Sequence, residues 1–197
     1  RFAPAMKQIA LPLDTLRSGG PDSLIVTDSN AAAVAALGAS ERWPGHCAIL
    51  VGPPRSGKSL MARYFIGRGG ESIDDADSLD EETLFHRWNA ARDAERSILL
   101  LSTKLPAEWG VTLPDLRSRL GASQLIEISA PDEELINQLI LKHLRDRGTS
   151  IGPEALSYAV RRIERSHAAV EDFAREANAL ALAEGSAVNL GLVRRLF

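Results

Sequence analysis

Residues 52–59 read Gly52-Pro53-Pro54-Arg55-Ser56-Gly57-Lys58-Ser59 and fill every fixed position of the pattern G-x-x-x-x-G-K-[ST]. The apolar run 47–51 before them is a plausible buried strand, and residues 60–66 after them can propagate a helix. A strand, a glycine-rich turn and a helix N-terminus in this order aim backbone N–H groups at a phosphate, with the helix dipole behind them. The stretch therefore predicts a phosphate-binding loop, called the phosphate loop below.

We expect the phosphate loop to hold the polyphosphate of a nucleotide. Lys58 would reach the β- and γ-phosphates, and the hydroxyl of Ser59 would hold Mg²⁺. The expected nucleotide-binding set is the loop with the residue that follows it: Gly52, Pro53, Pro54, Arg55, Ser56, Gly57, Lys58, Ser59 and Leu60.

The composition excludes several classes of protein. The chain has 197 residues, of which 45% are hydrophobic and 25% charged, as is ordinary for a soluble globular protein. A net charge of −3 argues against a protein whose main role is to coat nucleic acid. The single cysteine, Cys47, leaves no disulfide framework or cysteine metal cluster. The sequence has neither a membrane-spanning apolar run nor a signal-peptide pattern, so we expect a cytoplasmic protein without a membrane partner.

Short apolar runs alternate with helical patterns up to residue 130. The strand candidates are 24–26, 47–51, 71–73, 97–102 and 124–128, and a helical pattern covers 80–95. This alternation predicts a parallel α/β sheet. From Pro131 onward only helical patterns follow. We therefore expect an extended arm over 1–20, an α/β nucleotide-binding domain over 21–130 and a small all-helical domain over 131–197.

The pair Asp74-Asp75 follows the short apolar run 71–73. At the end of a strand beside the phosphate loop, Asp74 would hold Mg²⁺ and Asp75 would polarise the attacking water. Taken alone, such a pair is more typical of a solvated turn or a helix cap, but the complete phosphate loop favours the catalytic interpretation. Three further acidic residues are expected to cap the next helix: Asp77, Asp80 and Glu81.

Two other polar segments leave alternatives open. Residues 102–104, Ser-Thr-Lys, end the run 97–102 and would either sense the γ-phosphate or cap a helix. Residues 113–120 contain Arg117 and Arg119 just before the last strand candidate. One of these arginines would reach a neighbouring subunit's nucleotide as an arginine finger, or both would lie on a solvated helix face.

Four segments in this order resemble a known family. They are GPPRSGKS at 52–59, IDDAD at 73–77, LLLST at 99–103 and WGVTLPDLRSRL at 109–120, followed by the helical region. The chain resembles AAA+ ATPases of the DnaA type, and within them the Hda-like regulators, over residues 8–197. The resemblance implies an AAA+ phosphate-loop core with a helical lid. It ends at the lid, where the initiator DnaA continues into a DNA-reading domain, so no sequence-specific DNA binding is expected.

The resemblance also implies roles for individual residues. Asp74 matches the Mg²⁺ position, Asp75 the water-polarising position and Arg119 the arginine finger. Ile25 and Asn30 match the adenine side of the site. The segment Gln8-Ile9-Ala10-Leu11-Pro12-Leu13 resembles the sliding-clamp-binding motif at the N-terminus of Hda-like proteins. In that motif Gln8 hydrogen-bonds, Leu11 and Leu13 fill an apolar groove, and Pro12 limits the chain entropy lost on binding.

The sequence departs from the family in two places. Few residues separate the phosphate-loop helix from Asp74, so we expect a sheet with fewer strands than usual. In the lid, Ala169 stands where the family has an arginine that contacts the nucleotide, although Arg162, Arg165 or Arg175 could substitute for it. Loss of that cation should weaken γ-phosphate recognition more than ADP binding. We therefore expect ADP or ATP with Mg²⁺ as the ligands, and weak intrinsic hydrolysis.

The resemblance implies a regulator of replication initiation. Tethered to the DNA polymerase sliding clamp, it would dock on ATP-bound DnaA and promote hydrolysis of that ATP. A homodimer is compatible with this interpretation. One alternative is a non-catalytic adaptor that links a partner to the clamp. Another is a helicase-loader-like ATPase acting on single-stranded DNA, which the acidic net charge and the shortened core disfavour.

Overall fold

The computed structural model describes residues 24–197. The expected arm over 1–20, with Gln8, Leu11, Pro12 and Leu13, lies outside the described residues. Within them, eight α-helices, four strands and four short 3₁₀ helices follow one another. The 3₁₀ helices are η2 (Ser40–Arg42), η3 (Pro44–His46), η4 (Ala76–Ser78) and η5 (Pro106–Glu108).

The described strands form one parallel sheet in the order β2-β3-β1-β4. Their bounds are β1 (Cys47–Val51), β2 (Glu71–Ile73), β3 (Ile98–Ser102) and β4 (Gln124–Glu127). This arrangement confirms the predicted parallel α/β sheet. It also agrees with the expected reduction in strand number, because α2 ends at Ile66 and β2 begins at Glu71.

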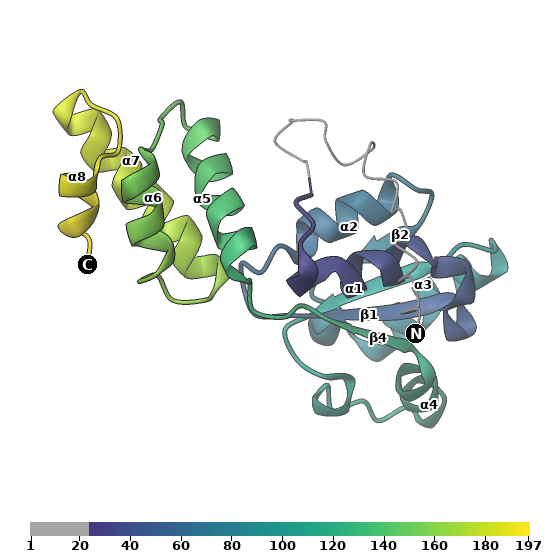
Figure 1. Cartoon of the computed structure of the whole chain (residues 1–197). Coiled ribbons are helices and arrows are strands. Elements are labelled where there is room, and N and C mark those ends of the chain that lie inside the picture. The colour runs from purple at the N-terminus through teal and green to yellow at the C-terminus, as the bar shows by residue number, and fades with distance from the viewer. Residues whose placement is uncertain (1–23) are drawn as a thin grey trace, which may run out of the picture.

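Helices cover both faces of the sheet (Figure 1). Ala48 and Leu50 of β1 point to the face covered by α1 (Asp28–Gly38) and α2 (Lys58–Ile66). Cys47 and Ile49 point to the opposite face, where α3 (Glu81–Asp93) and α4 (Pro114–Ala122) supply the apolar partners. Side chains alternate between faces along a strand, so a continuous apolar run such as 47–51 requires burial on both sides.

The strand expected over 24–26 is wrong, because these residues belong to no strand. The reason is local. The amide of Asn30 donates to the carbonyl of Ile25 at 2.8 Å and accepts from the backbone N–H of Thr27 at 2.8 Å. This capping box starts α1 and uses backbone groups that a strand would offer to a neighbour.

Four helices follow the sheet and pack around a hydrophobic core of their own. They are α5 (Glu133–Asp146), α6 (Pro153–Val160), α7 (His167–Glu184) and α8 (Leu190–Arg194), together called the lid. Asp132, Ser166 and Asn189 cap the N-termini of α5, α7 and α8 through side-chain oxygens. Ile136, Ile140 and Leu144 place one face of α5 in this core, and each such residue contributes about 1.5–3 kcal/mol by leaving water.

The lid lies beside the sheet unit (Figure 1) and is joined to it near its first turn. The carboxylate of Asp132, which caps α5, also accepts the backbone N–H of Ser29 at 3.0 Å. One side chain thus joins the N-termini of α1 and α5. None of the described helices has the length and apolarity needed to cross a membrane.

Candidate nucleotide-binding site

The residues of the candidate site meet at the carboxyl edge of the sheet. In the strand register, Val51 lies opposite Ser102, and Ile73 lies opposite Leu100. The phosphate loop follows β1, and Asp74 follows β2 directly. Since all strands run parallel, the loop, the acidic turn and the end of β3 share one edge.

The backbone of the phosphate loop has two residues in the left-handed region, Arg55 at φ +62° and Gly57 at φ +88°. Gly57 is the N-cap of α2, and Lys58 is the first residue of that helix. The ammonium group of Lys58 donates to the carbonyl oxygens of Gly52 at 2.7 Å and Pro53 at 2.9 Å. Lys58 therefore lies against the inside of the loop, at the N-terminus of a helix whose dipole favours an anion.

The loop is packed so tightly that Gly52 has no room for a side chain. A Cβ atom there would lie 2.7 Å from Oγ of Ser56 and 3.1 Å from Cβ of Ile128. The Ser56 hydroxyl is buried and has no hydrogen-bond partner in the described part of the chain. Leaving such a group unpaired costs about 1–3 kcal/mol, so a hydrogen-bonding ligand at the loop would be favoured. These features fit a nucleotide phosphate.

Three carboxylates lie within electrostatic range of Lys58. Burial lowers the pKa of Lys58, while the charges of Asp75, Asp74 and Asp77 oppose this effect. The predicted pair Asp74-Asp75 and the loop lysine thus lie at the same edge of the sheet and influence each other through their charges. Both side chains are exposed, and Asp75 has a left-handed backbone at φ +48° that starts η4. Ser59 and Asp74 are the residues that would hold Mg²⁺, as hard oxygen ligands.

Sequence reasoning missed the position of Asp77. Only Asp80 caps α3, by accepting the N–H of Thr83 at 2.9 Å. The Asp77 side chain is only 7% exposed and lies 3.7 Å from the ammonium group of Lys104. Its assignment as a cap was wrong because the η4 turn directs it inward. A short acidic run gives no signal that tells one such residue from the next.

Glu81 is not a cap either, because its carboxylate accepts the backbone N–H groups of Thr112 at 2.8 Å and Leu113 at 2.7 Å. It thereby holds the loop that leads into α4. The other polar segment forms a local turn: Ser102 Oγ accepts the N–H of Lys104 at 2.9 Å and donates to its carbonyl at 2.8 Å. Residues 102–104 do not cap the next helix, whose N-cap is Leu105, so the γ-phosphate role stays a prediction. Lys104 pairs with Asp77 at 3.7 Å.

On the adenine side, Asn30 is buried and both ends of its amide bind local backbone. Asn30 therefore shapes the segment around Ile25. The remaining residues of the predicted set lie in the loop or directly after it: Pro53, Pro54 and Ser59 are exposed, and Leu60 is half-buried on α2.

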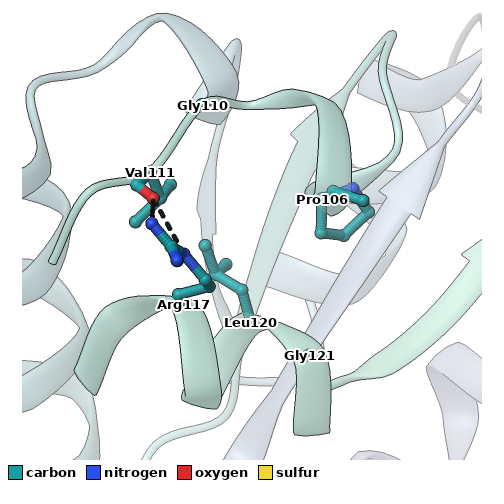
Figure 2. Close-up of a pocket in the computed structure, with 7 residues that line it drawn as sticks. Pro106, Gly110, Val111, Arg117, Leu120 and Gly121 are labelled. Atoms are coloured by element: carbon teal, nitrogen blue, oxygen red, sulfur yellow. Dashed lines mark hydrogen bonds between the residues drawn. The ribbon is translucent and has the colours of Figure 1, made fainter. Parts of the chain in front are cut away.

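Arg119 does not lie on a solvated helix face. Its guanidinium donates to Oδ1 of Asn89 at 2.8 Å, pairs with Asp115 at 2.8 Å and stacks over the ring of Phe85 at 4.7 Å. These contacts hold it against α3. Arg117 instead donates from Nε to the carbonyl of Val111 at 3.0 Å, beside a hollow of about 530 Å³ between η5 and α4 (Figure 2). Residues of the phosphate loop do not line this hollow.

On the lid side, Ala169 lies in the first turn of α7, where its N–H binds the capping Ser166 at 3.1 Å. The three arginines that could replace the missing cation all contact lid residues. Arg165 pairs with Glu133 at 2.8 Å, Arg162 stacks on Tyr158 at 3.7 Å, and Arg175 pairs with Asp172 at 2.7 Å. The cation at the contact between lid and loop is Arg55, which belongs to the loop. Nothing in the sequence pattern indicated this contact.

No protein-family model matches the chain. Among solved structures, domain III of the Thermotoga maritima replication initiation protein DnaA superimposes with a TM-score of 0.71 and 18% identity, covering 88% of this chain and 93% of that domain. The Thermotoga maritima RuvB Holliday junction branch migration motor gives 0.64 and 17%, over 91% of this chain and 71% of RuvB. AMPPCP-bound DnaA from Aquifex aeolicus gives 0.60 and 18%, over 83% and 64%. At these identities the likeness establishes the fold, which is the AAA+ fold of DnaA domain III.

Proposed function

We propose that this protein binds an adenine nucleotide with Mg²⁺ and regulates the replication initiator DnaA. The observation that carries the nucleotide-binding part is the phosphate loop, where Lys58 at the start of α2 lies against the loop carbonyls of Gly52 and Pro53 and the same loop holds a buried hydroxyl without a partner among the described residues. AMPPCP bound to an AAA+ protein of similar fold supports the choice of an adenine nucleotide.

The chain supplies the groups that phosphate chemistry needs. Lys58 binds the phosphates, Ser59 and Asp74 hold the metal, and Asp75 orients a water molecule and accepts its proton. When bound, Mg²⁺ neutralises phosphate charge. Ala169 lies in the first turn of α7, so this position adds no cation to neutralise the phosphates. We therefore propose slow intrinsic hydrolysis and long-lived binding of ADP.

The finer part of the proposal concerns partners. The segment Gln8–Leu13 would bind the sliding clamp, and the AAA+ unit would dock on ATP-bound DnaA and promote its hydrolysis. Support comes from the motif itself and from the likeness to DnaA domain III. Arg119 would act on the shared nucleotide, for which it must leave Asn89 and Asp115.

The test is the decay of labelled ATP bound to DnaA, measured with this protein and DNA-loaded clamp. We expect faster decay that disappears in a Gln8→Ala, Leu11→Ala variant and in Arg119→Ala. Full stimulation by Arg119→Ala would remove Arg119 from the mechanism. If the protein binds the clamp but does not accelerate the decay of DnaA-bound ATP, the second candidate function applies.

That second candidate is a non-catalytic adaptor that links a partner to the clamp. Two observations favour it: Ala169 provides no cation, and Arg119 is held by its own chain. Steady-state ATPase of the isolated protein separates the two, with Asp75→Asn as control. Turnover that Asp75→Asn abolishes excludes the adaptor, whereas its absence together with tight nucleotide binding supports it.

A further inference from the structure

Arg55, in the phosphate loop, contacts the lid helix α7 through its guanidinium group. Its Nε donates to Oε2 of Glu171 at 2.9 Å. Its two terminal nitrogens donate to the two carboxylate oxygens of Asp172, each at 2.9 Å. A further contact of 3.4 Å reaches the carbonyl of Ala168. The guanidinium thus binds one carboxylate in a two-point fork and a second one at its edge, which is the strongest geometry for such a pair.

The charges at this contact are mutually reinforcing. Hydrogen bonds from Arg55 lower the pKa of Asp172, and the two carboxylates raise the pKa of Arg55. Arg175 also pairs with Asp172 at 2.7 Å, so the acceptor is already held in place on α7. Ordering one more side chain on a fixed partner costs less entropy than ordering both partners of an isolated pair.

Side-chain hydrogen bonds join the lid to the sheet unit at two points of the part of the chain that the structure describes. One is the bond from Ser29 to Asp132 at the start of α5, close to where the chain enters the lid. The other is Arg55 on α7. A rotation of the lid that pivots near Asp132 must break the Arg55 contacts, because they lie away from the pivot.

We propose that Arg55, Glu171 and Asp172 form a latch that closes the lid over the phosphate loop and sets the rate of nucleotide exchange. The inference rests on the proposed nucleotide site. In this latch the loop supplies the cation and the lid supplies the anions. Lid closure therefore does not depend on the γ-phosphate, and the latch retains ADP and ATP equally.

The latch and simple charge repulsion predict opposite signs for one variant. Glu171→Gln combined with Asp172→Asn removes two negative charges near a polyphosphate, which by Coulomb's law alone would slow nucleotide release. If the two acids hold the lid closed, the same variant releases nucleotide faster. For a fork-shaped pair that is partly exposed, we expect dissociation to accelerate roughly 3- to 10-fold.

The experiment is stopped-flow dissociation of a fluorescent ADP and a fluorescent ATP analogue from the full chain. The matched control is Arg195→Ala, which removes an exposed arginine that pairs with Glu184 inside the lid. We expect the acid variant to accelerate release of both nucleotides by a similar factor and the control to match the wild type. Slower or unchanged release, or acceleration for ATP alone, would overturn the latch.

A second measurement needs no nucleotide. Spin labels at His86→Cys on α3 and Leu182→Cys on α7 report the distance from the sheet unit to the lid, since both positions are exposed. Cys47 will not compete, because burial raises the pKa of its thiol to about 12. We expect a longer, broader distance distribution in Arg55→Ala and in the acid variant. If the spin-label distance distribution does not change in these variants, the latch is refuted even when the protein binds nucleotide. If the distribution changes but the protein binds no nucleotide, only the proposed nucleotide site is refuted.

Discussion

The ammonium group of Lys104 lies 3.7 Å from the carboxylate of Asp77 and joins the end of β3 to the acidic turn after β2. The pair is asymmetric, because the Asp77 side chain is 7% exposed and that of Lys104 is 59% exposed. Removal of the exposed partner therefore leaves a charge in a buried position, whereas removal of the buried partner leaves a charge in water. This asymmetry makes the two ends of the pair unequal in their effect on stability.

We expect Lys104→Met to lower the free energy of unfolding by about 1 kcal/mol, since it leaves the Asp77 carboxylate without its cation. Asp77→Asn should change it by less than half as much, because Lys104 remains hydrated. Urea unfolding at neutral pH measures both values. Equal losses in the two variants would show that the carboxylate is stabilised by other groups.

Gly52→Ala should destabilise the protein by about 1–3 kcal/mol, because its Cβ would lie 2.7 Å from Oγ of Ser56. Ser56→Ala removes that oxygen and an unpaired buried hydroxyl, so it should be neutral or stabilising without nucleotide. Thermal unfolding of both variants and of the double variant tests this. The double variant should lose less stability than Gly52→Ala, and simple additivity would contradict the close contact.

Lys58→Ala should weaken nucleotide binding roughly 10- to 100-fold, as expected for loss of a charged hydrogen-bond donor to phosphate. Isothermal titration with ADP and Mg²⁺ measures the effect. Arg68→Ala is the matched control, since Arg68 lies beyond the other end of α2 and stacks over Tyr64 at 4.2 Å. Equal affinity in the wild type and Lys58→Ala would refute the phosphate loop as the binding site.

Acid should release the lid. Desolvation alone would raise the pKa of Asp132, but the N–H groups of Leu135 and Ser29 lower it, and Arg55 lowers the pKa of Asp172. A lowered folded-state pKa means that the stabilisation is complete above the ordinary value of 3.8 and is lost as pH falls through the folded value. The spin-label distance should therefore lengthen only below about pH 4.

Asp132→Asn is the control for this acid transition. Its single amide oxygen can accept only one of the two N–H groups, from Ser29 and Leu135, that the carboxylate accepts on separate oxygens, and the group no longer titrates. We expect a shallower pH dependence of the spin-label distance in this variant than in the wild type. A lid that opens instead at a higher pH, just below the ordinary histidine value of 6.5, would assign the transition to other groups, such as His143 and His167, whose pKa values burial lowers.

Local sequence patterns predicted most of the strands and helices of the fold. The runs 47–51 and 97–102 each coincide with a strand, because buried parallel strands are apolar on both faces. The run 124–128 coincides with the edge strand β4, in which Ile126 is buried and the other residues are exposed. The run 24–26 is equally apolar, but Asn30 binds its backbone, and a side chain a few residues away outweighed strand propensity. Asp77 and Glu81 show the same limit: they belong to one short acidic segment but contact different partners, because Asp77 lies in η4 and Glu81 begins α3.

The sequence by itself determined the phosphate loop, the acidic turn after β2 and the parallel succession of strands and helices. Each of these features depends on the spacing, the backbone preferences and the apolar periodicity of residues within a few positions of one another, so the order of the residues alone predicts it. Only the tertiary structure decided that Asp77 pairs with Lys104, that α3 holds Arg119, and that Arg55 contacts a lid helix 116 residues further along the chain. Contacts of this kind follow from how whole helix and sheet faces pack, because that packing fixes which distant side chains meet.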